Sequence, residues 1–456
     1  MAVIERARRV SPALRRIAIV AFIVLVPIAM HTAWDHYEAR RLSRLVSDLR
    51  ARNEPVASIA TIADAESPDN AARYYEAAAA LVDARDLYGA TGILNRLDYS
   101  PEVDRRQLVQ AITSWLERNR EAEALLARAT DLPFEGYPPG THYSYRTDRL
   151  HRLAKLANLR TFERLEAGDA EAAAQSLLRQ FQINRALGAS GPSDLSVIGM
   201  GWAAVPALRE MDRFLAARPS EASLRAVQQA IRGLDNDQAL HQSMLAERAF
   251  TLGSYWDESR GWYARHRDMP NQAFSYVMRP LLTRWFVENI QLMTTLIAQA
   301  RQPWPERLHV NVPDRPPGSP GRRRFPFVRI PEATHTLGTS YRTRARSIAT
   351  ALALGRSADA AIAAERFRRA TGALPGALGQ LVPEYLPAVP IDPFSGGEIR
   401  YLKAADRVVV YSVGLNEQDD GGEKIEYPVL RSGALQNRRA PPDFGVSIRA
   451  APAGQR

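Results

Sequence analysis

The chain has 456 residues, of which 46% are hydrophobic, and a formal net charge of +10. This length predicts two or three domains with sizeable hydrophobic cores. The chain contains no cysteine, which excludes disulfides, cysteine-based zinc sites and cysteine nucleophiles. Acidic and basic residues are interspersed rather than gathered on one segment, and this pattern argues against nucleic-acid binding. Almost all of the positive charge comes from arginine, a usage that we take to indicate a bacterial genome rich in GC.

An uncharged segment near the N-terminus, Ile17–Trp34, predicts a transmembrane helix. Its 18 residues just suffice to cross a bilayer core, and membrane helices tolerate a proline such as Pro27. Five arginines lie between residues 1 and 16 and favour a cytoplasmic N-terminus. We therefore expect residues 1–34 to form a basic cytoplasmic leader and a single-pass anchor in a bacterial inner membrane, with the bulk of the chain in the periplasm.

The same region leaves other interpretations open. Arg40, Arg41 and Arg44 lie beyond the segment and weaken the charge asymmetry. A cleaved signal peptide would place His31 and Ala33 where an Ala-x-Ala site is expected, and they match it poorly. A buried helix in a soluble protein is the remaining interpretation.

Helical periodicity from residue 35 to residue 305 predicts an irregular antiparallel array of helices. Gly168-Asp169 predicts a helix end followed by an N-cap, in a hairpin that faintly resembles a tetratricopeptide helix pair, and Pro219-Ser220 predicts another helix boundary. No strict repeat period is present. In the first part of this region, one buried face is predicted by residues at helical spacing: Tyr74, Ala77, Ala78, Leu81 and Val82.

Residues 250–286 combine aromatic and cationic side chains and form a candidate binding region. Its candidate residues are Trp256, Arg260, Trp262, Arg265 and Trp285. Such a combination suits a binding groove or a membrane-interface face. A long loop folded onto the helical core by its own aromatic rings is the alternative. The Pro- and Arg-rich residues 306–333 that follow predict a linker.

The C-terminal part contains five short motifs in order. They are Gly-Ala-Leu-Pro at 372–375, Leu-Val-Pro-Glu-Tyr-Leu at 381–386, Pro-Ile-Asp-Pro-Phe at 390–394, Tyr-Ser-Val-Gly at 411–414 and Gly-Gly at 421–422. In this order they resemble the C-terminal domain of the major pseudopilin of type II secretion systems. The resemblance implies an α+β domain at residues 334–435, with a small antiparallel sheet packed on a long helix. The prepilin peptidase site of that family does not precede Ile17, so assembly as a pilin subunit is not expected.

The residues themselves support two strands in this domain, because 398–402 and 407–412 alternate with period two. Residues 436–456 are polar and rich in proline and arginine, and they predict a disordered tail.

An acidic glycine loop after the second strand is the candidate metal site. The resemblance implies a structural Ca²⁺ held by the Val413 carbonyl, by Asn416 in place of a first aspartate, and by a second carboxylate. That second ligand would be Glu423, or Asp419 and Asp420. Calcium prefers several oxygen ligands on a curved backbone, which the glycines here allow. Asn416 departs from the family's charged ligand, and a plain solvated turn is the alternative.

The expected fold class is mostly α, with an N-terminal transmembrane helix, an irregular helical array and a small pseudopilin-like α+β domain. No catalytic histidine pair, Gly-x-Ser-x-Gly elbow or P-loop is present in the sequence. We therefore expect a membrane-anchored envelope protein that acts through protein partners, including components of a type II secretion or pilus-like system. The alternative is an envelope hydrolase or a lipid- or glycan-binding protein that uses residues 250–286.

Overall fold

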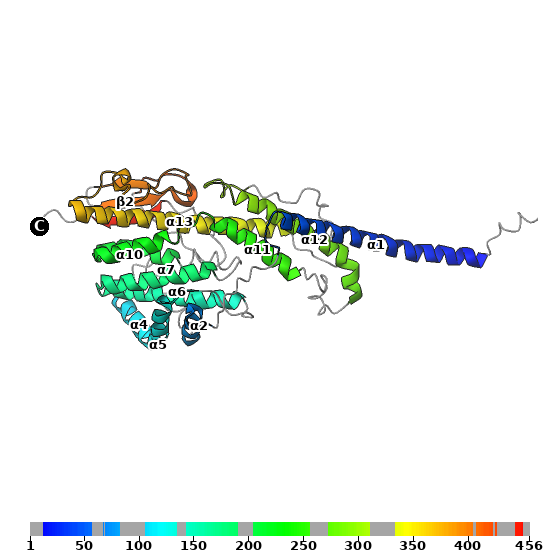
Figure 1. Ribbon diagram of the computed structural model, residues 1–456, viewed down its shortest axis with the longest axis horizontal. Coiled ribbons are helices and arrows are strands. Elements are labelled where there is room, and N and C mark those ends of the chain that lie inside the picture. Colours follow the sequence, from blue (N-terminus) through cyan, green and yellow to red (C-terminus); the bar gives the residue numbers. More distant parts are fainter. Residues whose placement is uncertain are drawn as a thin grey trace, which may run out of the picture. The chain divides into compact units, whose positions relative to one another are not determined.

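The computed structural model describes residues 12–56, 67, 69–82, 105–134, 143–189, 204–255, 272–310, 333–404, 407–422, 425 and 443–449. It confirms the expected fold class, because the chain is mostly helical, with a long apolar helix near its N-terminus and a small antiparallel sheet near its C-terminus (Figure 1). The chain divides into two compact units. The first comprises Met1–Ser58, Arg248–Thr295 and Pro313–Thr334, and the second comprises Ile59–Glu247, Leu296–Val312 and His335–Arg456. The domain boundaries predicted from the sequence stay predictions.

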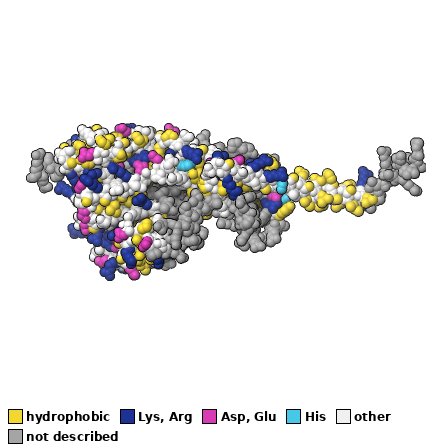
Figure 2. Space-filling model, in the orientation of Figure 1, with side chains coloured by type: hydrophobic (Ala, Val, Ile, Leu, Met, Phe, Trp, Pro, Cys, Tyr) yellow, Lys and Arg dark blue, Asp and Glu magenta, His cyan; other side chains and the backbone are white. Residues whose placement is uncertain are grey.

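Helix α1 (Pro12–Ala51) belongs to the first unit, and its exposure changes along its length. Between Leu14 and Met30 the large apolar side chains are exposed, and Figure 2 shows them as a nearly continuous hydrophobic surface. Further along, Leu42, Val46 and Leu49 are buried at helical spacing and form one packed face. By length and composition, α1 is able to cross a membrane.

Two other helices contribute to the first unit, α11 (Ala239–Tyr255) and α12 (Gln272–Gln299). The fully buried Arg248 of α11 donates hydrogen bonds to Glu54, which follows α1, and to Thr294 of α12 at 3.1 Å. A buried guanidinium needs such partners, because an uncompensated charge in the interior costs several kcal/mol. These contacts tie the end of α1 to the other two helices.

The second unit contains the helical array. Its described helices are α2 (Ala71–Leu81), α4 (Arg105–Arg118), α5 (Arg120–Thr130), α6 (Tyr143–Glu166), α7 (Ala170–Ala189), α9 (Met211–Ala216) and α10 (Glu221–Arg232). Gly168 adopts a left-handed φ of +73° between α6 and α7, and Asp169 Oδ1 accepts the N–H of Ala172 at 3.0 Å. Ser220 Oγ accepts the N–H of Ser223 at 3.1 Å and caps α10. Both helix boundaries that the sequence predicted are therefore confirmed.

The face of α2 that is buried is shifted by about one residue from the face that the sequence predicted. Tyr75 is buried whereas Tyr74 is only partly buried, and Leu81 is 46% exposed. The helix contains so many alanines that two adjacent stripes are almost equally apolar, and the large Tyr75 ring decides which of them faces the core.

The C-terminal part of the second unit places a sheet along a long helix, α13 (Ala333–Thr371) (Figure 1). The strands are β1 (Arg400–Lys403), β2 (Arg407–Ser412) and β3 (Phe444–Arg449), in the order β1-β2-β3 with both pairs antiparallel. Two short 3₁₀ helices, η3 (Leu378–Leu381) and η4 (Gly414–Asn416), flank the first two strands. Residues 360–364 of α13 include four alanines and are fully buried, so other elements approach this helix closely.

The prediction that residues 436–456 form a disordered tail is wrong for Phe444–Arg449, which form strand β3. Phe444, Val446 and Ile448 alternate with period two and are buried, and β3 pairs with β2 along its whole length. Gly445 lies opposite Tyr411, where an added Cβ would lie 2.0 Å from the Val410 carbonyl oxygen. The outer edge of β3 is covered by α9, because the Ser447 N–H donates to Asp212 Oδ1 at 2.8 Å.

Candidate functional site

The buried carboxylate of Asp392 organises the segment that leads into the acidic loop. Its Oδ1 accepts hydrogen bonds from the Ser412 hydroxyl at 2.8 Å and the Phe394 N–H at 3.0 Å, and its Oδ2 accepts the Val413 N–H at 3.0 Å. The side chain is fully buried. Asp392 therefore joins the Pro-Ile-Asp-Pro-Phe motif to the Tyr-Ser-Val-Gly motif, which are 20 residues apart along the chain.

Four of the five predicted calcium ligands lie in the described part of the acidic loop. Asp419 Oδ1 accepts the Tyr411 hydroxyl at 3.0 Å, and its Oδ2 lies 3.2 Å from Arg400 Nε. Asn416 Nδ2 donates to Asp420 Oδ2 at 2.7 Å. The carbonyl of Val413 belongs to the buried residue that begins the loop.

The fifth ligand, Glu423, lies outside the described residues. Within the described part of the chain, no group of three acidic or histidine side chains is close enough to hold a metal ion. The predicted ligands are instead joined by hydrogen bonds to one another and to the sheet.

Asp443 is a carboxylate beside this loop that the sequence prediction missed. It directly precedes β3 and is fully buried, and its Oδ2 accepts the Gly422 N–H at 2.8 Å. Its Oδ1 is buried and has no hydrogen-bond partner among the described residues. Burial raises the pKa of Asp443, and the charges of Asp419 and Asp420 raise it further, against the opposing effect of the Gly422 and Asp420 N–H groups. An unsatisfied buried carboxylate oxygen next to two further acids is chemically suited to a cation.

The predicted aromatic–arginine region is only partly described. Trp256, Arg260, Trp262 and Arg265 lie outside the described residues. Trp285 lies on α12 with a partly buried side chain, and its carbonyl accepts Asn289 Nδ2 at 2.9 Å. Whether these residues come together stays a prediction.

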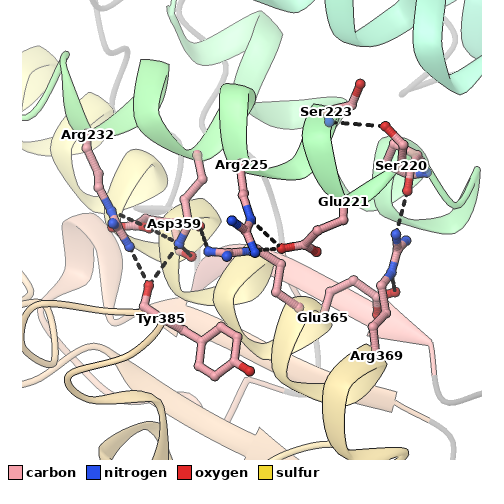
Figure 3. Close-up of polar contacts among 12 residues, drawn as sticks. Ser220, Glu221, Ser223, Arg225, Arg232, Asp359, Glu365, Arg369 and Tyr385 are labelled. Carbon is pink, nitrogen blue, oxygen red and sulfur yellow. Dashed lines mark hydrogen bonds and ion pairs between the residues drawn. The ribbon is translucent and has the colours of Figure 1, made fainter.

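A polar network between α10, α13 and the turn at Tyr385 forms a second constellation, which the sequence analysis did not identify (Figure 3). Gln228 Nε2 donates to Asp359 Oδ1 at 2.6 Å, and Arg232 Nε donates to Asp359 Oδ2 at 2.9 Å. Both side chains also reach the Tyr385 carbonyl, Arg232 Nη2 at 2.6 Å and Gln228 Nε2 at 3.2 Å. These bonds hold the Leu-Val-Pro-Glu-Tyr-Leu motif against the helical array.

The network continues along the two helices. Arg366 of α13 donates from Nε to Glu221 Oε1 and from Nη1 to Gln228 Oε1, both at 2.8 Å. Arg369 donates to the Pro219 carbonyl at 2.6 Å and to Glu365 Oε1 at 2.9 Å. Helix α10 thus has a polar stripe beside its buried apolar stripe, and α13 presents the matching stripe.

A small cavity lies beside this network and has a volume of about 40 Å³. Ile231, Leu352, Arg356 and Pro390 are among the residues that line it. Pockets for organic ligands usually have about 300–1,000 Å³, so this cavity has room for water only.

Among the described residues, burial also raises the pKa of two other carboxylates, Asp359 in the network and Glu247. Burial raises the pKa of Glu247 to about 7, although Arg344 Nη2 lies 3.3 Å from its Oε2. A pKa near neutrality suits a general acid or base, but Glu247 does not line the cavity described above.

Comparison with protein-family models gives no match, and neither the curated proteins nor the solved structures contain one that is significantly similar to this chain. The function therefore has to be argued from the chain's own residues.

The polar network generates a stability prediction. Replacing Asp359 by alanine removes the carboxylate that accepts from the buried Gln228 amide and from Arg232 and leaves them only backbone carbonyls, so we expect the free energy of unfolding to fall by about 2–4 kcal/mol. Arg225→Ala is the matched control on α10, because its ion pair with Glu221 is exposed and should contribute under about 1 kcal/mol. Urea unfolding of the solubilised chain measures both values. If the two variants lose the same small amount of unfolding free energy, the network has no stabilising role.

Proposed function

We propose that the chain is a single-pass inner-membrane protein whose periplasmic part acts through contacts with other proteins. The observation that supports this proposal is the exposed apolar half of α1. Ten large hydrophobic side chains between Leu14 and Met30 are exposed, whereas the second half of the helix buries one face. A lipid bilayer is the environment in which such a surface is stable.

The proposed orientation places the N-terminus in the cytoplasm, because five arginines precede Ile17. The two parts of the second unit then have different proposed roles. The helical array provides an extended scaffold, and the domain formed by α13 and the sheet carries the motifs that resemble the major pseudopilin. Pseudopilin domains work by packing side by side, so partners from a secretion or pilus-like system are part of the proposal.

Affinity purification of the full-length chain, tagged at its C-terminus and gently solubilised from native membranes, tests this function. We expect the chain to stay in the membrane pellet after alkaline carbonate washing, and secretion or pilus components to be enriched over untagged membranes. Recovery of the chain alone would contradict the interaction, and release by carbonate would contradict the anchor.

Two glycine variants show whether the sheet is the part of the chain that contacts the protein partners. Gly445→Val clashes with β2 and should lower partner recovery while the chain stays in the membrane. Gly379→Ala is the matched control, because an added Cβ meets no atom within 4 Å there, and it should leave recovery unchanged.

We also propose that the acidic loop binds a structural Ca²⁺, with Asp443 as a further ligand beside Val413, Asn416, Asp419 and Asp420. Since the pKa of Asp443 is raised above its ordinary value of 3.8, the folded chain binds more protons than the unfolded chain above that pH. The contribution of Asp443 to stability therefore falls as pH rises from 3.8 through the higher pKa that Asp443 has in the folded chain. A bound cation would remove that penalty at neutral pH.

Calcium titration followed by thermal unfolding tests the metal site. At free Ca²⁺ one hundred times its Kd, we expect the free energy of unfolding to rise by about 2.7 kcal/mol. Asp443→Asn should stabilise the chain in EDTA at neutral pH and weaken the calcium response. Glu398→Gln, an exposed acid in the same domain, should change neither. Identical unfolding in Ca²⁺ and EDTA would show that the loop is a plain turn.

A further inference from the structure

The beginning of α12 contacts α1 at His31, within the first unit. His31 Nε2 donates a hydrogen bond to the Val277 carbonyl at 3.0 Å. The His31 and Tyr276 rings are also in contact, with their centroids 4.9 Å apart. Two independent contacts therefore fix the position of Tyr276 and Val277 along α1.

A charge pair lies one helical turn further along α1. Arg279 Nε of α12 donates to Asp35 Oδ1 at 2.6 Å, and the Arg279 guanidinium lies 5.4 Å from the centre of the Tyr276 ring. Asp35 is the first charged residue after the apolar run. Pairing with Arg279 lowers the cost of placing this carboxylate at the edge of a membrane.

The length of the apolar run shows where that edge falls. The 18 residues of Ile17–Trp34 rise by about 27 Å, slightly less than a bilayer core of about 30 Å. If the core begins at Ile17, its far boundary falls at or just beyond Trp34. His31 comes three residues, or about 4.5 Å, before Trp34. Tyr276 and Val277 therefore lie about 4.5 Å or slightly more on the hydrocarbon side of that boundary, next to the interfacial region.

The side chains at this depth suit an interface. Tyr276 is 44% exposed and Val277 is 59% exposed, although both are largely apolar. On α1, the exposed rings of Trp34 and Tyr37 lie at the same end of the apolar run. Tryptophan and tyrosine are enriched where membranes meet water, because their apolar bodies and polar tips match that boundary.

We propose that the first turns of α12 lie at the edge of the bilayer that α1 crosses, with Tyr276 and Val277 inserted where the acyl chains meet the lipid headgroups. This inference rests on the proposed membrane anchor. It adds a second contact with the same leaflet, so the first unit would be held at the membrane surface by two helices rather than by one. The Asp35–Arg279 pair would lie at the boundary between lipid and water.

Spin labelling of the full-length chain in vesicles of phosphatidylethanolamine and phosphatidylglycerol tests this contact. The chain has no cysteine, so a single introduced cysteine carries the nitroxide without a background. The test positions are Tyr276→Cys and Val277→Cys. Leu25→Cys in the apolar half of α1 is the deep reference, and Gln291→Cys, an exposed position further along α12, is the aqueous reference. Accessibility to oxygen divided by accessibility to a water-soluble nickel complex reports depth.

We expect the ratio at positions 276 and 277 to be several-fold higher than at position 291 and lower than at position 25. If positions 276 and 277 match position 291 while position 25 is deep, α12 does not touch the membrane and the anchor still stands. If position 25 is also aqueous, the anchor fails and this inference fails with it.

Discussion

One physical feature dominates the structure, which is that the large apolar side chains in the first half of α1 are exposed in the described part of the chain. Ten large hydrophobic side chains between Leu14 and Met30 are exposed. Burying such a side chain is worth about 1.5–3 kcal/mol, so leaving all ten in water forgoes about 15–30 kcal/mol. That exceeds the net stability of a typical domain, about 5–15 kcal/mol. A bilayer would remove this cost, and by length and composition the helix is able to cross one.

Within the second unit, two buried carboxylates organise the region around the C-terminal motifs. Asp392 joins two of the motifs through hydrogen bonds to backbone and hydroxyl groups. Asp359 joins α13 to α10 and, through Gln228 and Arg232, to the Tyr385 turn. Because each carboxylate is buried and paired, removing either would leave polar groups unsatisfied. The same bonds give the sheet and the acidic loop a fixed position on the helical array.

The sequence predicts those features that depend on neighbouring residues. Gly168-Asp169 and Ser220 mark helix boundaries correctly, because a left-handed glycine and an N-cap act within one turn. Contacts between distant residues could not be predicted in this way, since Arg232 and Asp359 are 127 residues apart. Strand β3 was missed because its short alternating pattern is flanked by proline and arginine, and Asp443 was missed with it.

The most direct test of membrane anchoring is labelling with a membrane-impermeant maleimide in intact spheroplasts. Two single-cysteine variants are compared, Ala2→Cys before α1 and Leu81→Cys at an exposed position of the second unit. If the second unit is periplasmic, Leu81→Cys is labelled in intact spheroplasts. Ala2→Cys is labelled only after lysis, and the labelled band has the size of the full-length chain. Labelling of Ala2→Cys alone in intact cells, or loss of residue 2 from the mature chain, would contradict an uncleaved anchor with this orientation.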